Sequence, residues 1–261
     1  MDVSQFGLEG RTVIITGGSG GIGRGCVRVF AQAAANVVVA SLPGESIPPV
    51  VAEAEGLGAQ ALGLAVDVTD EAQVDRLVQQ TLERFGRVDV LLNIAGGSAS
   101  RNLEMPQFRR GALVNLEPAD FLAAYAVNVE SAFLCSRAVV PQMKARGKGA
   151  IVNIGSMSGL AGYKQRAEYS AYGAAKAALH RLTEYMAHQW APEVRVNCIA
   201  PGTIDTPRPP GVVRPDLAGA AERIDVGRVG TAEDIANVAL FLASDAAAFV
   251  NAVVIPVHGG E

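Results

Sequence analysis

Short runs of β-branched and other apolar residues alternate along the chain with longer segments that carry apolar residues at helical spacing. Several short runs are almost continuously apolar, which is typical of parallel strands covered on both faces. The short runs predict strands at Arg11–Thr16, Asn36–Ser41, Gln60–Val66, Val88–Ile94, Ala150–Gly155, Val194–Ala200 and Ala252–Val257. The periodic segments predict helices at Ile22–Ala34, Ile47–Glu55, Asp70–Phe85, Ala119–Ala145, Ser170–Ala191 and Ala232–Ala243.

Two residues are placed to start helices. Thr69 stands before the third helix, and Thr231 with Asp234 three residues later resembles a capping box before the last one. The strand–helix alternation implies right-handed crossovers and an α/β fold, a single doubly wound parallel sheet of the Rossmann type with helices on both faces. No linker or repeat divides residues 1–261, so we expect one domain. Ligands of such sheets bind beyond the carboxyl ends of the strands.

Composition and charge exclude several classes of protein. Of 261 residues, 49% are apolar, and the net charge of −4 argues against a nucleic-acid binder or a polybasic membrane anchor. The first ten residues have no apolar core and predict no secretory signal. The longest apolar stretch, 235–257, is interrupted by Asn237, Asp245 and Asn251, so we expect no transmembrane helix.

The cysteines and histidines show neither disulfide nor metal-ligand spacing. Cys26, Cys135 and Cys198 are far apart in apolar segments and are interpreted as buried free thiols. The three histidines form no metal motif. A reducing cytoplasm is therefore the expected location, and no metal site is predicted.

A glycine-rich turn follows the first strand and precedes the first helix, over residues 16–23. Such a turn lets a pyrophosphate approach the backbone, and the helix start offers free N–H groups. The glycines fit two registers, one through Gly18, Gly20 and Gly23 and the other through Gly17, Gly21 and Gly23. The turn predicts a nucleotide site, although a plain strand–helix connection would also explain it.

The second strand ends without the usual marker of cofactor preference. An acid that binds the ribose of NAD is expected at this strand end, but the position holds Ser41, followed by Leu42. No arginine is nearby to hold the 2′-phosphate of NADP. The choice between NAD(H) and NADP(H) therefore stays open.

Only one of the five tyrosines has a lysine four residues later, Tyr172 with Lys176. On a helix the two side chains share a face. An ammonium ~4–5 Å from a phenol stabilises the phenolate by about 3–4 kcal/mol, enough to make the phenol a usable acid or base. Ser156 ends the fifth strand, where its hydroxyl could polarise a substrate carbonyl or simply cap a turn.

Together, motifs spread over essentially the whole chain resemble the short-chain dehydrogenase/reductase family of the classical type. The resemblance implies that Tyr172 is the general acid/base, that Lys176 assists it, that Ser156 polarises the substrate and that Asn128 holds a water in a proton relay. Asn128 repairing a helix kink and Asp67 capping a strand end are the structural alternatives. The implied cofactor-binding residues are Gly17, Ser19, Gly21, Ile22, Gly23, Ser41, Asp67, Val68, Asn93, Ala95, Gly96, Tyr172, Lys176, Pro201, Gly202, Ile204 and Thr206.

The expected function is an NAD(P)(H)-dependent oxidoreductase that interconverts a secondary alcohol and a ketone. The alternatives are a 3-oxoacyl thioester reductase on the same scaffold and a nucleotide-binding regulator without turnover. An insert near residues 98–116 carries Arg101, Arg109 and Arg110 and is either a wall of the substrate pocket or a solvated loop. Two long helices with apolar residues on more than one face, an apolar last strand and the resemblance predict a homotetramer.

Overall fold

The computed structural model describes residues 6–98, 113–163, 169–207 and 217–261, and in this part of the chain seven strands form one sheet. The strand order is β3-β2-β1-β4-β5-β6-β7, and all neighbouring strands are parallel. The prediction of a doubly wound parallel sheet is confirmed. The strands are β1 Thr12–Thr16, β2 Asn36–Ser41, β3 Ala61–Ala65, β4 Val90–Asn93, β5 Gly149–Ile154, β6 Val194–Pro201 and β7 Val254–Val257.

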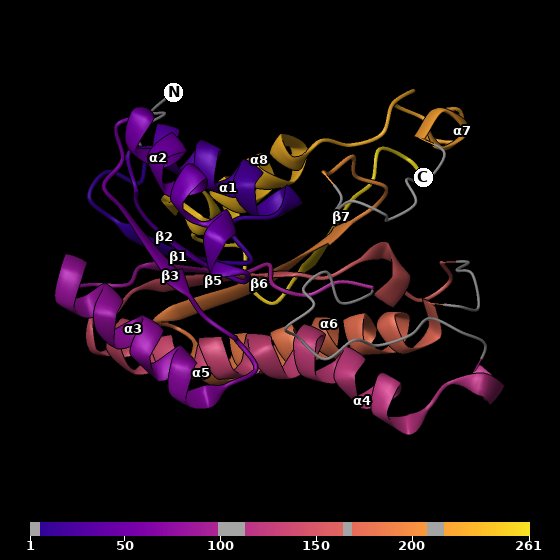
Figure 1. Ribbon diagram of the computed structural model, residues 1–261, viewed down its shortest axis with the longest axis horizontal. Helices are drawn as coiled ribbons and strands as arrows, with labels where there is room; N and C mark the ends of the chain where they lie inside the picture. Colours follow the sequence, from indigo (N-terminus) through magenta and orange to yellow (C-terminus); the bar gives the residue numbers. More distant parts are fainter. Residues whose placement is uncertain (1–5, 99–112, 164–168, 208–216) are drawn as a thin grey trace.

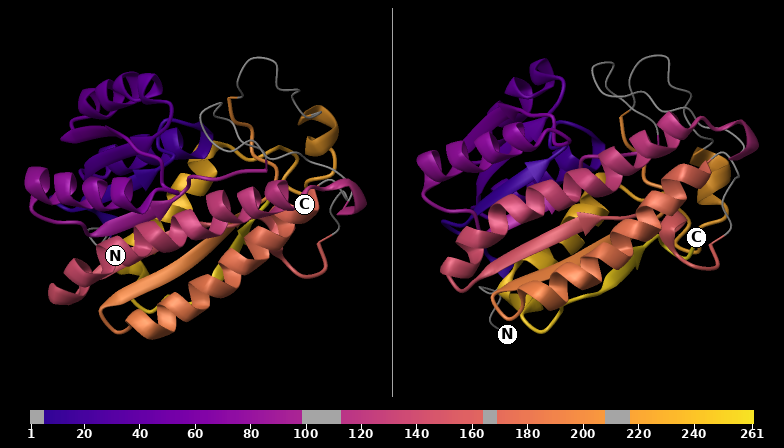
Figure 2. Two further views of the ribbon diagram at one scale, coloured as in Figure 1. Left: turned by 60° about the horizontal axis from the view of Figure 1, so that its bottom comes forward. Right: turned by 90° about the horizontal axis from the view of Figure 1, so that it is seen from below.

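Helices cover both faces of this sheet (Figure 1). One face packs against α1, α2 and α8, and the other packs against α3, α5 and α6. Figure 2 shows α5 and α6 running alongside each other in front of the sheet, with α4 continuing the line of α5. The helices are α1 Gly21–Gln32, α2 Pro48–Gly56, α3 Glu71–Phe85, α4 Pro118–Tyr125, α5 Ser131–Ala145, α6 Ser170–Trp190, α7 Leu217–Ala221 and α8 Ala232–Ala243.

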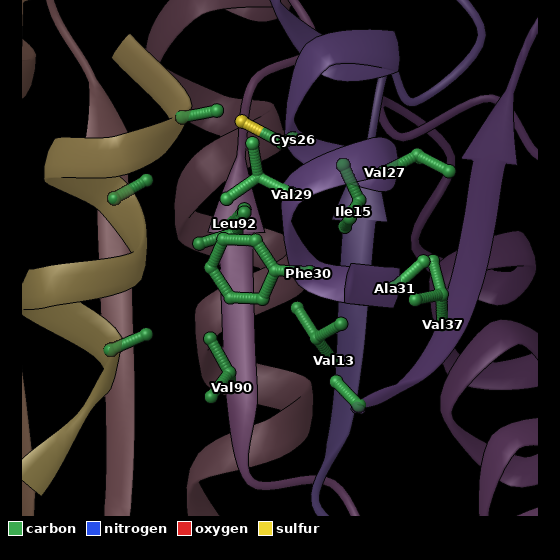
Figure 3. Packing of buried hydrophobic residues seen from close by; sticks show 14 of the residues in the cluster. Val13, Ile15, Cys26, Val27, Val29, Phe30, Ala31, Val37, Val90 and Leu92 are labelled. Carbon is green, nitrogen blue, oxygen red and sulfur yellow. The ribbon is translucent and has the colours of Figure 1, made fainter. Parts of the chain in front are cut away.

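The five inner strands bury both of their faces, as their composition predicts, whereas the edge strands β3 and β7 are only partly buried. All five residues of β1 are buried. Val13 and Ile15 lie beside Phe30 of α1 in one core cluster (Figure 3), whereas Ile14 belongs to the cluster on the opposite face. Because successive strand residues point to opposite faces, an apolar residue is needed at every position.

The predicted helix Ala119–Ala145 is helical throughout, but it contains a π-helical turn at Ala126–Glu130 between α4 and α5. The Nδ2 group of Asn128 in this turn donates to the Ala124 carbonyl (2.9 Å), and its Oδ1 accepts the N–H of Gly97 (3.0 Å). The second contact joins residues 31 positions apart. Helical periodicity carries no trace of such a partner, although a helix kink at Asn128 is one of the alternatives that the sequence leaves open.

The helix caps show one correct and one wrong prediction. Thr231 and Asp234 form the predicted capping box of α8. The cap of α3 is Asp70, whose side chain accepts the N–H of Gln73, and not Thr69. Thr69 instead donates from both its N–H and its hydroxyl to Asp67.

Two predicted elements are shorter in the structure because the chain turns into the left-handed region. Ala34 has a φ of 61°, and α1 ends at Gln32 rather than at Ala34. Ala252 has a φ of 60°, and β7 begins at Val254. Glycine is the residue that usually adopts a positive φ, so an alanine at these positions gave no sign of the turn.

The strand order places β1 and β4 side by side, with the chain progressing outwards from them in opposite directions. The crevice of a doubly wound sheet opens at this point, beyond the carboxyl ends of the strands. β7 lies at an edge of the sheet, as predicted. Among the helices that the structure describes, none has the length and apolar character required to cross a membrane.

Candidate active site

The glycine turn between β1 and α1 forms the first wall of the site. Gly17 has a φ of 65°, and a Cβ there would lie 3.0 Å from the backbone of Ala95. A Cβ on Gly23 would lie 2.1 Å from the Gly17 carbonyl, and one on Gly21 would lie 2.8 Å from Thr206. A Cβ on Gly20 meets nothing nearer than 3.8 Å. The geometry therefore favours the register through Gly17, Gly21 and Gly23.

The start of α1 leaves hydrogen-bond donors open to an anion. The helix begins at Gly21, and its N-cap residue, Gly20, provides no side-chain cap. The N–H groups of a first helical turn have no partner within the helix, and the helix dipole adds positive potential there. Backbone donors and a close-packed glycine turn are the features that a dinucleotide pyrophosphate needs, so the residues present fit an NAD(P) cofactor.

Three serine hydroxyls meet at the carboxyl end of β2. The Ser19 and Ser41 oxygens are 2.6 Å apart, and the Ser46 hydroxyl lies 2.7 Å from Ser19. Ser46 belongs to a short 3-10 helix at Gly44–Ser46, and its role in this cluster was not predicted. Neither a carboxylate nor a cation takes part in these bonds. The cluster therefore brings no formal charge to the expected ribose position.

The next part of the wall follows β3 and β4. Val68, Ala95 and Gly96 line the cavity as predicted. Asp67 and Asn93 lie behind it. Asp67 accepts two hydrogen bonds from Thr69, and Asn93 donates to Asn153 (2.8 Å) inside the core.

Asn128 also lies behind the wall, where it is 1% exposed. Its amide binds both the N–H and the carbonyl of Gly97, each at 3.0 Å. A Cβ on Gly96, which has a φ of 140°, would lie 2.7 Å from the Asn128 Oδ1 atom. The side chain thus ties the π turn to the loop after β4, in line with the structural alternative for this residue.

Tyr172 and Lys176 lie on consecutive turns of α6 and both line the cavity. The Lys176 ammonium is 5.8 Å from the centre of the Tyr172 ring and donates to the Ile154 carbonyl at 2.6 Å. Burial lowers the pKa of Lys176 to about 8, since the charged form loses solvation there. Most molecules keep this lysine protonated at neutral pH.

Ser156 follows β5 and faces the same cavity as Tyr172. It caps the short 3-10 helix η5, Met157–Gly159, by accepting the N–H of Ser158 at 3.1 Å. Its hydroxyl donates to the Ser158 hydroxyl at 3.0 Å. A substrate oxygen could replace this second serine as the acceptor.

The loop after β6 closes the site. Thr203 lies between the predicted residues Gly202 and Ile204 and was not predicted. Its N–H and its hydroxyl donate to the Glu261 carboxylate at 2.7 and 2.8 Å. The polar residues after the strand predict a loop at this place. Only the fold shows that Glu261, at the other end of this part of the chain, lies against that loop.

All these walls enclose one cavity of about 480 Å³ at the carboxyl ends of the strands. Ser158, the neighbouring alternative to Ser156, and Tyr169 also line it. Sequence reasoning missed Tyr169, for which the only available signal was its position just before α6. The insert arginines Arg101, Arg109 and Arg110 lie outside the described residues. The predicted residues that line the cavity are Gly17, Ser19, Gly21, Ile22, Gly23, Ser41, Val68, Ala95, Gly96, Ser156, Tyr172, Lys176, Pro201, Gly202, Ile204 and Thr206.

Known proteins resemble this chain over nearly its full length. It is 35% identical over 254 residues to the 3-oxoacyl-(acyl-carrier-protein) reductase of Thermotoga maritima, a match that covers 97% of this chain and 98% of the relative. It is 36% identical over 255 residues to the 7α-hydroxysteroid dehydrogenase of Escherichia coli strain K12, covering 97% and 94%. A solved 7α-hydroxysteroid dehydrogenase, in complex with NADH and 7-oxoglycochenodeoxycholic acid, matches with a TM-score of 0.87 and 35% identity, covering 100% and 97%.

A family model described as enoyl-(acyl carrier protein) reductase matches residues 17–261. With this match and these relatives, the chain belongs to the short-chain dehydrogenase/reductase family. It is an NAD(P)(H)-dependent oxidoreductase that interconverts alcohols and ketones, as the sequence predicts.

Proposed function

We propose that Tyr172, Ser156 and Lys176 perform the proton chemistry of a reaction between a cyclic secondary alcohol and its ketone. The observation that carries the proposal is their meeting in one cavity with the glycine turn. The bound nicotinamide supplies or accepts the hydride. In the reductive direction the Tyr172 hydroxyl gives its proton to the carbonyl oxygen, and in the oxidative direction the phenolate takes it back.

The neighbouring side chains assist this proton transfer. The buried Lys176 ammonium beside the Tyr172 ring favours the phenolate that remains after the proton has left. The Ser156 hydroxyl turns from Ser158 to the substrate oxygen and stabilises the negative charge that develops there. Both effects act on the same oxygen-to-oxygen proton transfer.

The backbone and hydroxyl donors of the turn hold the cofactor in this proposal. The first turn of α1 binds the pyrophosphate, and Ser19 and Ser41 bind the adenosine ribose. Because their hydroxyls carry no charge, they neither repel a 2′-phosphate nor form an ion pair with it. We therefore expect the enzyme to accept both NAD(H) and NADP(H). Val68 lies at the adenine end, with Asp67 holding the turn behind it.

The role of Asn128 in a proton relay stays a prediction, because its amide binds Gly97 and Ala124 in this structure. Its neighbour Val127 lines the cavity, and the π turn places Asn128 directly behind that wall. We further propose that residues 1–261 act as one catalytic domain in which the insert near 98–116 contributes to the substrate pocket.

A ring-shaped substrate is favoured by the two matches to 7α-hydroxysteroid dehydrogenases, one of which holds a 7-oxo bile acid. The 35% identity to a 3-oxoacyl reductase favours a second candidate, reduction of a 3-oxoacyl thioester. Turnover on matched panels of ring ketones and 3-oxoacyl thioesters, each with NADH and NADPH, separates the two. We expect kcat/KM for the best ring ketone to exceed that for any thioester by at least tenfold. The reverse ranking would favour the second candidate, and turnover of neither panel would contradict both.

We also propose a homotetramer located in the cytoplasm. Leu122 of α4, Phe133 of α5 and Tyr185 of α6 expose 65%, 39% and 52% of their surface. A second copy would cover these side chains, and another contact would cover the sheet edge at β7. Free buried thiols at all three cysteines agree with a reducing compartment. Light scattering tests the assembly, and a mass near 27.0 kDa would contradict it.

A further inference from the structure

A buried histidine stands one helical turn beyond the Tyr172–Lys176 pair. His180 is 6% exposed and belongs to α6, as the other two residues do. Residues four apart on a helix share a face, so Tyr172, Lys176 and His180 form one line along α6. The proposed reaction does not involve the imidazole of His180.

The imidazole contacts both ends of the turn that carries Ser156. Its Nε2 atom accepts the N–H of Ser156 at 3.3 Å. The ring also lies against Gly159, the last residue of the turn, where a Cβ would come within 2.8 Å of the His180 Cε1 atom. The same turn is closed by a bond from the Gly159 N–H to the Ser156 carbonyl at 3.0 Å. His180 thus binds the first residue of the turn and packs against the last.

Two glycines make room for the ring. A Cβ on Gly155 would lie 2.2 Å from the His180 Nε2 atom, and a Cβ on Gly159 would lie 2.8 Å from Cε1. A Cβ on Gly159 would also lie 2.7 Å from the backbone of Lys176 and Ala177. The two glycines therefore allow the turn to lie close to α6 and to the His180 ring.

The imidazole remains neutral at physiological pH. Burial, followed by the charge of Lys176, lowers the pKa of His180 to about 4, against smaller opposing effects of the Gly159 backbone and Glu184. A neutral ring keeps one nitrogen as an acceptor, which is what the Ser156 N–H requires.

Two consecutive side chains of the line fasten α6 to the end of β5. Lys176 donates to the Ile154 carbonyl, and His180 accepts from the Ser156 N–H. Because Tyr172 is on the same helix, these two bonds fix the position of the Ser156 hydroxyl relative to Tyr172. An error of about 1 Å in such a placement can lower a rate by about 100-fold.

We propose that His180 is a positioning residue, which holds the Ser156 turn against α6 so that the Ser156 and Tyr172 hydroxyls address the same substrate oxygen. This inference rests on the proposed roles of Ser156 and Tyr172. It adds a group that touches neither substrate nor cofactor and acts only through Ser156.

The test uses two amides of different reach. The Gln side chain in His180→Gln can place its carbonyl where Nε2 accepts the Ser156 N–H, whereas Asn in His180→Asn reaches only the Nδ1 position. We expect His180→Gln to keep kcat within about threefold and His180→Asn to lower kcat about 10- to 100-fold. The Kd for the reduced cofactor, followed by fluorescence, should change by less than twofold in both.

A double-mutant cycle distinguishes positioning from a general effect on packing. In a Ser156→Ala background, His180→Asn should lower kcat by less than about threefold, because the group that it positions is gone. The full 10- to 100-fold loss in that background, or equal rates for the Asn and Gln variants, would overturn the proposal. Full turnover of both Ser156→Ala and Tyr172→Phe would instead overturn the proposed function and the positioning role with it.

A measurement on the unaltered enzyme covers the case in which the Asn variant does not fold. Nitrogen NMR of protein labelled at its three histidines reports which ring nitrogen of His180 carries the proton. We expect the Nδ1–H tautomer at pH 7, assigned by loss of the signal in His180→Gln. An Nε2–H tautomer would overturn the proposal, since Nε2 could not accept the Ser156 N–H.

Discussion

The two ends of the sheet both carry a cavity, but their polar groups have different partners. At the amino end, Asp89 binds Arg87 and Arg146, and Asp245 binds Arg11 and Lys148, around a cavity of about 400 Å³.

At the carboxyl end the polar groups bind mainly backbone atoms and each other's hydroxyls. Lys176 donates to a carbonyl oxygen, Ser156 pairs with Ser158, and Ser19 pairs with Ser41. Ion pairs that satisfy each other hold the fold together. Hydroxyls and a buried ammonium that are held by the backbone can exchange one partner for a ligand. We therefore assign a role in stability to the amino end of the sheet and a role in catalysis to the carboxyl end.

The largest expected effect is at the carboxyl end. Tyr172→Phe removes the proton donor and keeps the ring, so turnover should fall by about 10²–10⁴-fold. Cofactor Kd and the midpoint of thermal unfolding should stay close to those of the unaltered enzyme. A variant that keeps a tenth of the normal rate would refute the role of Tyr172.

The pH dependence of stability should separate the two ends. The pKa of His180 is about 6.5 in the unfolded chain, and burial lowers it to about 4 in the folded protein. Between these two pH values the unfolded chain binds a proton at His180 that the folded protein does not bind. Protons therefore favour the unfolded state in this window, and the free energy of unfolding falls by at most about 3 kcal/mol as the pH drops through it.

Asp245 at the amino end acts in a lower window. The hydrogen bond from Arg11, with a further contribution from Lys148 and against some desolvation, lowers the pKa of Asp245 to about 2 from 3.8. Its stabilisation is lost only as the pH falls from about 3.8 towards 2. Denaturant titrations from pH 7.5 to 2.5 measure the free energy of unfolding at each pH. In His180→Gln this free energy should no longer fall between about pH 6.5 and 4, and its fall below about pH 3.8 should remain. Loss of the lower fall instead would contradict the assignment of the upper one to His180.

A smaller effect on stability alone is expected from Asp89→Asn. Its carboxylate accepts from Arg87, Arg146 and the Thr12 N–H, and its residue is 8% exposed. Because both arginines retain partial contact with water, we expect a loss of about 1–3 kcal/mol rather than the larger cost of stranding a fully buried charge. Denaturant unfolding measures it, with kcat per folded molecule as the control. A fall in kcat beyond threefold would show that the amino end also serves the reaction.

The smallest expected change concerns cofactor preference. Ser41→Asp places a carboxylate in the serine cluster and should shift the ratio of kcat/KM values about 10- to 30-fold towards NAD(H), through repulsion of a 2′-phosphate. Ser41→Asn, of the same size without the charge, is the matched control. An unaltered enzyme that rejects NADP(H) outright would contradict the expectation that the cluster tolerates both.

The sheet and most of its helices were predictable because burial on both faces imposes an apolar run on each parallel strand. The π turn at Asn128 was anticipated only as one alternative, a helix kink, because its bond to Gly97 joins parts of the chain that are distant in sequence. The cap of α3 was misplaced by one residue because Thr69 and Asp70 are both good cap residues.

The candidate site was predictable where a residue lies at the carboxyl end of a strand, as Ser41 and Ser156 do. His180 and Glu261 escaped notice because each reaches its loop from a distant element, and only the fold brings them together. Asn93 follows the same strand rule as Ser156, yet its side chain points into the core and binds Asn153. Position after a strand therefore identifies the edge of the sheet but not which way a side chain faces.

A crystal structure with bound cofactor and a ring ketone tests the division between the two ends most directly. The account predicts both ligands in the carboxyl-end cavity, with the ketone oxygen about 3 Å from the Tyr172 and Ser156 hydroxyls. A ketone oxygen out of hydrogen-bond reach of both hydroxyls, or ligands seated among the ion pairs at the amino end, would contradict it.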